Sequence, residues 1–161
     1  MIILTPTDAQ LAEAEERANK MGAIRNSHYK GGGNFIGFVG EVCVRDYLEA
    51  DNTSCKDYDI TKDGMRIDVK TKLTRYPPKE NYACTIYKTS LHQQCDSYVF
   101  ARFDKVKNKV YVCGWMPKKD FIENAHFTKK GDVDQSNGYV AQADAYDLEI
   151  GKLKPMELLW Q

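Results

Sequence analysis

Residues 57–72 alternate apolar and polar positions with the two-residue period of a β-strand. An Asp-Gly pair at residues 63–64 interrupts the alternation, and this dipeptide favours a two-residue turn between antiparallel strands. The segment therefore predicts a β-hairpin. In its register Asp59 stands opposite Asp68, although like charges placed opposite each other destabilise a sheet.

The hairpin register sorts the side chains onto two faces, because successive strand residues point to opposite sides. The apolar face, which we expect to contact the core, collects Tyr58, Ile60, Met65, Ile67 and Val69. The opposite face collects Asp57, Asp59, Thr61, Arg66, Asp68, Lys70 and Lys72. This separation is typical of a half-buried hairpin.

Two helices are predicted before the hairpin. The first follows Thr7, whose spacing to Gln10 fits a capping box, and it ends near Gly22. The second is capped by Asn34 and extends to about residue 50. Residues 25–34 between them are predicted to form a loop, which lacks the Lys-Ser/Thr pair of a phosphate-binding loop.

Gly37 and Gly40 lie inside the second predicted helix. Each costs about 1 kcal/mol relative to alanine. We therefore expect the helix to press closely on a sheet or a substrate at these positions.

Apolar and β-branched runs predict further strands at residues 82–88, 97–103 and 109–115. Pro117 is suited to open a short helix, which we expect to end at about residue 125. Residues 128–138 are polar and predict a loop. A strand within residues 138–146 and a closing turn are expected to follow.

These elements predict one mixed α/β (α+β) domain. It is expected to cover residues 1–161, with an N-terminal helix (1–22), a core (35–125) and a loop with a C-terminal extension (126–161).

The composition is that of an ordinary globular protein, with 42% hydrophobic and 29% charged residues. We find no apolar run long enough to span a membrane and no signal-peptide pattern at the N-terminus. The five cysteines form no CxxC pair, and we expect them to be reduced and buried. Together these features predict a cytoplasmic protein.

The charges are unevenly distributed although the formal net charge is zero. Residues 60–130 hold 15 Lys and Arg against 7 Asp and Glu, whereas the rest of the chain holds 8 against 16. The asymmetry is compatible with a basic face for a polyanion. Solvated lysine-rich strands and turns explain it equally well.

The opposed Asp59 and Asp68 suggest a cation site. Opposite residues of a hairpin have Cβ atoms roughly 4.5–5.5 Å apart, which lets one divalent cation contact both carboxylates. Mg²⁺ takes carboxylate oxygens readily, and Mn²⁺ is expected to substitute for it. A solvent-facing hairpin in which Asp57 pairs with Lys70 is the alternative interpretation.

The hairpin and the preceding helix carry a short combination of residues that resembles a known family. Asp59, then Asp68 and Lys70 two residues apart, follow a helix with Glu41. This combination is similar to the PD-(D/E)XK nuclease superfamily, whose restriction-endonuclease-like core has the order α-β-β-β-α-β around a central mixed sheet. The resemblance covers a little over half of the chain. It departs from the family where Tyr58 stands in place of the frequent proline.

The resemblance implies a metal-dependent phosphodiesterase. It implies that Asp59, Asp68 and the Val69 carbonyl are metal ligands. Glu41 would complete the metal site or hold a water, and Lys70 would be the catalytic lysine. Without the resemblance, Glu41 has another explanation as an exposed helical ion pair with Arg45, worth about 0.2–0.5 kcal/mol.

The expected substrate is nucleic acid, with DNA favoured over RNA because the superfamily acts mostly on DNA. Tyr76 is a candidate for stacking on an unpaired base, with packing in its loop as the alternative. Basic residues near the motif are expected to hold the phosphate backbone: Lys62, Arg66, Lys72, Arg75 and Lys79.

In its small size the chain resembles stand-alone phage nucleases and junction resolvases, many of which are homodimers. Endonuclease, exonuclease and junction-resolving activities all stay open. The alternative function is a non-catalytic nucleic-acid-binding or structural module with a retained nuclease fold. A nucleotide-binding protein that uses residues 27–34 is a third hypothesis.

Overall fold

The computed structural model describes residues 1–22, 32–53 and 55–159. Most of the loop predicted at residues 25–34 lies outside these ranges. The described residues form three α-helices and two β-sheets, which confirms the mixed α/β class. None of the described helices is long and apolar enough to cross a membrane.

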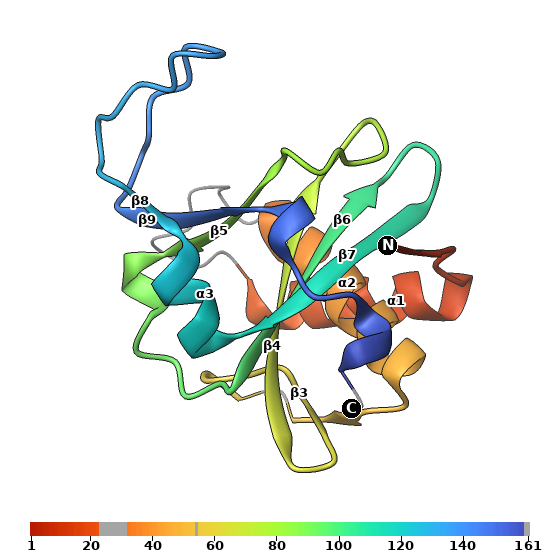
Figure 1. Cartoon of the computed structure of the whole chain (residues 1–161). Coiled ribbons are helices and arrows are strands. Elements are labelled where there is room, and N and C mark those ends of the chain that lie inside the picture. The colour runs from red at the N-terminus through yellow and green to blue at the C-terminus, as the bar shows by residue number, and fades with distance from the viewer. Residues whose placement is uncertain (23–31, 54, 160–161) are drawn as a thin grey trace.

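A six-stranded sheet forms the centre of the molecule (Figure 1). All of its neighbouring strands are antiparallel except β4 and β6, which run parallel. Its strands, in spatial order, are β1 (Ile2–Leu4), β7 (Lys109–Pro117), β6 (Ser97–Asp104), β4 (Met65–Leu73), β3 (Ile60–Lys62) and β2 (Asp51–Asn52).

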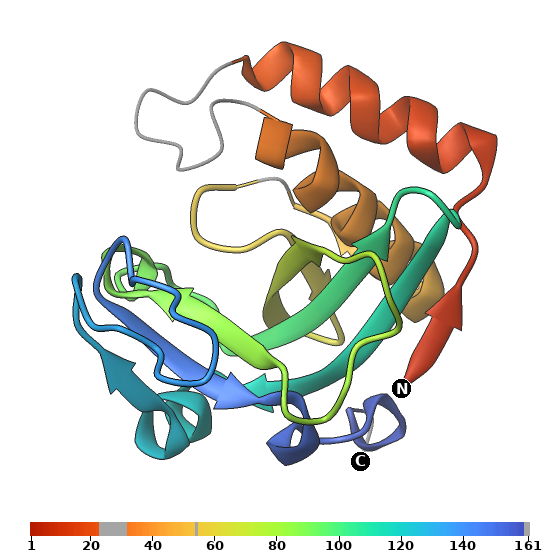
Figure 2. The same cartoon turned by 90° about the horizontal axis from the view of Figure 1, so that it is seen from above.

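A second, three-stranded sheet lies against one face of the central sheet, and two helices cover the other face (Figure 2). The small sheet has the order β5 (Ala83–Tyr87), β9 (Ala145–Glu149) and β8 (His126–Thr128). The helices are α1 (Asp8–Met21), α2 (Gly32–Leu48) and, beside the small sheet, α3 (Lys118–Asn124). Short 3-10 turns are η1 (Lys88–Ser90), η2 (Ile150–Lys152) and η3 (Met156–Leu158).

The helices follow the sequence prediction closely. Thr7 caps α1 with the predicted capping box, since its hydroxyl accepts from the Gln10 amide and the Gln10 side chain accepts from the Thr7 amide. The helix ends at Met21 before Gly22. Helix α2 begins at Gly32, two residues before the predicted cap at Asn34.

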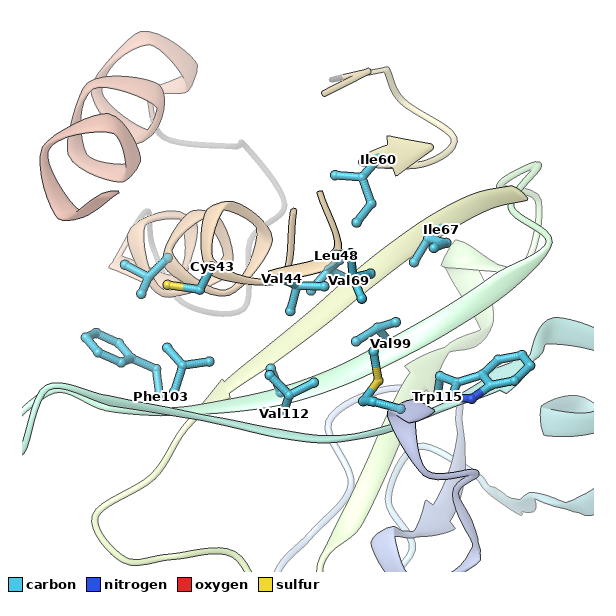
Figure 3. Packing of buried hydrophobic residues seen from close by; sticks show 14 of the residues in the cluster. Cys43, Val44, Leu48, Ile60, Ile67, Val69, Val99, Phe103, Val112 and Trp115 are labelled. Carbon is cyan, nitrogen blue, oxygen red and sulfur yellow. The ribbon is translucent and has the colours of Figure 1, made fainter. Parts of the chain in front are cut away.

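The larger core lies between α2 and the central sheet (Figure 3). Val44 of α2 packs there with Val69 of β4 and Val99 of β6. A second core lies on the opposite face, where Tyr98 of β6 packs with Phe121 of α3 at a ring separation of 5.6 Å. Strand β6 is therefore buried on both faces, which explains its nearly continuous apolar sequence.

The chain departs from the α-β-β-β-α-β order after the hairpin. The predicted strand at residues 82–88 forms as β5, but it belongs to the small sheet. In the described chain, the turn η1 and no α-helix lies between β5 and β6. The crossover that joins the parallel pair β4 and β6 thus passes through β5, one strand of the small sheet.

Several short elements differ from the prediction. Strands β1, β2 and β8 have two or three residues each, too few for a periodic pattern. Most of the strand predicted within residues 138–146 is instead part of a loop that projects from the body (Figure 1), because β9 begins only at Ala145. The cysteines are reduced, but Cys55 is exposed and not buried as predicted.

Candidate active site

The hairpin has the predicted register. Lys62 pairs with Met65 and Ile60 with Ile67. The turn residues Asp63 and Gly64 both have positive φ, 49° and 81°, as a type I′ turn requires. Tyr58 does not lie on the predicted face with Ile60 and Ile67. It packs against the second core, on the other face of the central sheet. It precedes β3, where the alternation of strand side chains no longer applies.

Asp59 lies just before β3 and leaves the hairpin register. Its amide donates to the Ile67 carbonyl at 3.0 Å, although Ile67 is the register partner of Ile60. The predicted placement of Asp59 directly opposite Asp68 is therefore wrong. Beyond this point, β4 has no strand on its β3 side among the described residues. The Asp59 side chain occupies this open edge, since its Oδ2 accepts the Val69 amide at 2.7 Å. The N–H and C=O of one strand residue face the same edge, so the Val69 carbonyl also faces this side.

Asp68 is buried, with 2% of its surface exposed. Its Oδ2 lies 2.7 Å from Nζ of Lys70, two residues along the same face of β4. The two side chains form an ion pair. Within the described chain, Asp68 Oδ2 has no hydrogen-bond partner. A buried carboxylate oxygen in this state is available to a further ligand.

Helix α2 contacts the same edge of β4 through Gly40. A Cβ atom at this position would overlap the Thr71 hydroxyl. The glycine therefore lets the helix approach β4 and brings the next residue, Glu41, to the open edge. The predicted close packing holds at Gly40 but is wrong at Gly37, where a Cβ would meet no described atom within 4 Å.

Glu41 is held by an arginine that the sequence pattern did not indicate. Its Oε2 accepts from Arg17 of α1 at 2.8 Å, and the Arg17 guanidinium lies 4.5 Å from the centre of the Phe38 ring. Arg45 pairs instead with Glu13. The helical pair between Glu41 and Arg45 is therefore wrong as an explanation of Glu41. Arg17 stands 24 residues away in the chain, so no local spacing indicates it.

One cavity of about 790 Å³ unites the predicted catalytic residues. Its walls include Arg17, Lys56 and Gln93, and they include all four side chains that the sequence singled out, Glu41, Asp59, Asp68 and Lys70. The carboxylates thus come from three separate elements to the open edge of β4.

The buried carboxylates favour protonation or a cation. Burial raises the pKa of Glu41 to about 7, which the Arg17 charge opposes and the Asp68 charge reinforces. Burial also raises the pKa of Asp59 well above its ordinary value, with further contributions from Glu41 and Asp68. Burial lowers the pKa of Lys70, but the neighbouring Asp68 more than reverses this, and the net pKa is raised.

The carboxylates at the open edge of β4 are suitable ligands for a hard divalent cation, but they do not surround a complete metal site. Carboxylate oxygens, including Asp68 Oδ2, are ligands that Mg²⁺ and Mn²⁺ accept. No group of three or more His, Cys, Asp or Glu in the described ranges is close enough to hold a metal ion by itself. Arg17 and Lys70 occupy two of the carboxylates.

Three of the five residues predicted to bind nucleic acid make contacts within the chain. Lys62 donates to the Glu49 carbonyl, and Arg66 makes a bidentate contact with Asp96. Lys72 reaches between the sheets to Thr85 at 2.6 Å. Exposed side chains are those of Arg75, Lys79 and Tyr76, the last at 69%, so the packed interpretation of this tyrosine is wrong.

No protein-family model and no curated protein sequence matches the chain in the comparisons. The inferences about function therefore depend on the residues and on their arrangement.

Proposed function

We propose that this chain is a metal-dependent nuclease that hydrolyses phosphodiester bonds, in DNA more than in RNA. One observation carries the proposal: Glu41, Asp59, Asp68 and Lys70 line one cavity at the open edge of β4. Perturbed ionisable groups in a cavity are characteristic of functional sites. Their order along the chain is that of the PD-(D/E)XK superfamily, which the sequence resembles.

In this proposal Mg²⁺ or Mn²⁺ is held by Asp59, Asp68 and the Val69 carbonyl, and Glu41 completes the site. A bound divalent cation polarises the phosphate and lowers the pKa of a bound water. An opposite charge lowers the pKa of a carboxyl group. The raised pKa values of Glu41 and Asp59 are therefore those of the metal-free protein.

Lys70 acts as a cation in this site. In the metal-free protein the Asp68 charge raises the pKa of Lys70, so the ammonium group is protonated at neutral pH and is a hydrogen-bond donor. It is suited to stabilise negative charge on a phosphate oxygen rather than to take a proton from water. Asp68 holds the Lys70 ammonium in place at 2.7 Å before substrate binds.

The proposal places the protein among small stand-alone nucleases with a restriction-endonuclease-like core. Support comes from the hairpin, from α2 and from the parallel strand β6, which pairs with β4 along seven residues from Ile67 to Leu73. The small sheet in the crossover is a departure from the expected core.

The test is a cleavage assay with supercoiled, linear, single-stranded and branched DNA, and with RNA, in Mg²⁺ or Mn²⁺. The Asp68→Asn and Lys70→Met variants should lose cleavage. Asp63→Asn is the matched control, because it removes a carboxylate from the exposed turn and asparagine tolerates a positive φ. Cleavage that survives both active-site substitutions would refute the site. Nucleic-acid binding without any cleavage would favour a non-catalytic module.

A further inference from the structure

A second pair of like charges lies on the same face of the central sheet as Asp68. Lys72 of β4 and Arg102 of β6 are direct partners in the parallel register. Like charges at opposite positions destabilise a sheet, and both side chains are partly buried. The arrangement therefore has a cost in the protein alone.

Neutral acceptors hold the two cations. Lys72 Nζ donates to Thr85 Oγ1 at 2.6 Å, and Arg102 Nη2 donates to the Ala83 carbonyl at 2.8 Å. Lys72 Nζ also lies 3.5 Å from this same carbonyl oxygen of β5. The Arg102 guanidinium lies 5.2 Å from the centre of the Tyr82 ring. Within the described residues, neither cation forms an ion pair with a carboxylate.

The carboxylate closest to this pair along the hydrogen-bond chain is Asp147, which acts through a hydroxyl group. Asp147 Oδ1 accepts from Thr85 Oγ1 at 2.5 Å, and Oδ2 accepts from Thr128 Oγ1 at 2.8 Å. Both carboxylate oxygens are thus already engaged. Two positive charges share one indirect negative charge, so the site keeps an excess of positive charge for an anion.

The cations line a path that leads to the proposed active site. A cavity of about 610 Å³ is lined by Lys72 and Arg102, and by Lys70 and Thr71, which also line the active-site cavity. Lys72 and Arg102 also line a further cavity of about 1000 Å³ along the small sheet. Because each cavity shares lining residues with the next, the three cavities are neighbours, in an order that starts at the carboxylates, and we refer to them together as the groove.

We infer that Lys72 and Arg102 form a phosphate-binding subsite that holds a nucleic-acid strand next to the bond to be cleaved. The inference rests on the proposed nuclease function. Side chains two residues apart on a strand are about 7 Å apart, which is on the scale of the step between neighbouring phosphates in an extended strand. When Lys70 contacts the reacting phosphate, Lys72 and Arg102 contact the next one.

The proposal assigns a single strand, and not a double helix, to this groove. One wall is the central sheet and the other is β5 of the small sheet, whose Thr85 is in contact with Lys72. Packed sheets lie roughly 10 Å apart, whereas the major groove of a duplex alone is about 12 Å wide. Tyr87 lines the groove and offers a ring face for a base.

The test is the salt dependence of oligonucleotide binding in EDTA, measured by fluorescence anisotropy with a labelled single-stranded DNA. Each lost phosphate contact should lower the slope of log K against log salt by about 0.7. We expect this decrease for Lys72→Gln and for Arg102→Gln, together with a several-fold loss of affinity at low salt. Arg102→Lys keeps the charge and should keep the slope, which separates the contact from packing on Tyr82.

Lys119→Gln is the matched control, because this lysine is 84% exposed on α3 and its removal changes the net charge equally. It should leave the slope unchanged. An unchanged slope in Lys72→Gln and Arg102→Gln would overturn the subsite. An equal decrease with a blunt duplex would overturn the assignment to a single strand.

The binding assay needs no metal and no cleavage, so the two proposals fail separately. If no substrate is cleaved but the slopes decrease as stated, the subsite stands and the nuclease function fails. If DNA is cleaved but the slopes do not change, the nuclease function stands and the subsite fails.

Discussion

Like charges lie close together at both ends of the polar face of β4, but their contacts within the protein differ between the two ends. At one end, Asp68 has Lys70 beside it and Glu41 has Arg17. At the other end, Lys72 and its register partner are bound to neutral acceptors. The acidic end is compensated within the protein, whereas the basic end is not.

This difference indicates what each end binds. A cation that enters the acidic end has to compete with Arg17 and Lys70 for the carboxylates, so we expect metal affinity to be moderate and coupled to substrate. An anion at the basic end displaces no counter-charge. Strand β4 can carry like charges at both ends of its polar face because Ile67 and Val69, on its apolar face, are fixed in the larger core.

The largest expected effect is on catalysis at the acidic end. Asp68→Asn removes a proposed metal ligand and the partner of Lys70, so cleavage should fall by about 10²–10³-fold or more. Single-turnover cleavage in Mg²⁺ measures this, with Asp63→Asn as the control. Near-wild-type cleavage by Asp68→Asn would contradict the assignment.

The acidic end should also make the metal-free protein less stable as the pH rises. The pKa of Glu41 is raised from 4.5 to about 7 by burial. The folded protein therefore holds a proton that the unfolded chain has lost. This contribution to stability is complete below pH 4.5 and is lost as the pH rises through about 7, by up to roughly 3 kcal/mol.

Urea unfolding in EDTA between pH 4.5 and 8 measures this loss. Glu41→Gln should flatten the pH dependence, whereas Glu123→Gln on exposed α3 should leave it as in the wild type. Identical pH profiles for the wild type and Glu41→Gln would show that Glu41 does not carry the effect.

Gly40→Ala should destabilise the fold by about 1–3 kcal/mol, because the added methyl group overlaps Thr71 and pushes α2 away from β4. Gly37→Ala is a matched control in the same helix. No described atom lies within 4 Å of its added Cβ, and the substitution should stabilise the helix by up to about 1 kcal/mol. Denaturant midpoints compare the two. A stabilising Gly40→Ala would refute the close contact.

The smallest expected effects distinguish the two ends by their ligands. Mn²⁺ should raise the Tm of the wild type by a few degrees through the acidic end, and sulfate should do so through the basic end. Asp68→Asn should lose only the response to Mn²⁺, and Arg102→Gln should lose the specific part of the response to sulfate. General exclusion of sulfate from protein surfaces is common to all variants. If both variants respond alike, the two ends are not separate sites.

Local chemistry made much of the fold predictable. The capping box at Thr7 and the Asp-Gly turn each depend on a few adjacent residues, so their patterns were sufficient. The run at residues 97–103 was recognised as a strand because its residues are apolar on both faces. The spacing of Asp68 and Lys70 likewise placed both on one face of β4.

What was missed depends on contacts between distant segments. Arg17 reaches Glu41 from another helix, and Arg102 meets Lys72 only through the parallel pairing of β4 and β6. A parallel pair has no local turn to set its register, so the sequence alone did not indicate this cation pair. The small sheet was also missed because β5 has the same pattern as a strand of the central sheet.

We propose that the carboxylates at the open edge of β4 support metal-dependent cleavage. The most direct measurement is single-turnover cleavage of a single-stranded or branched DNA by the wild type and Asp68→Asn across a range of Mg²⁺ concentrations. We expect cleavage by the wild type that rises with Mg²⁺ and saturates, and a loss of at least about 10²-fold in the variant. Equal cleavage by the two proteins, or wild-type cleavage that persists in EDTA, would contradict it.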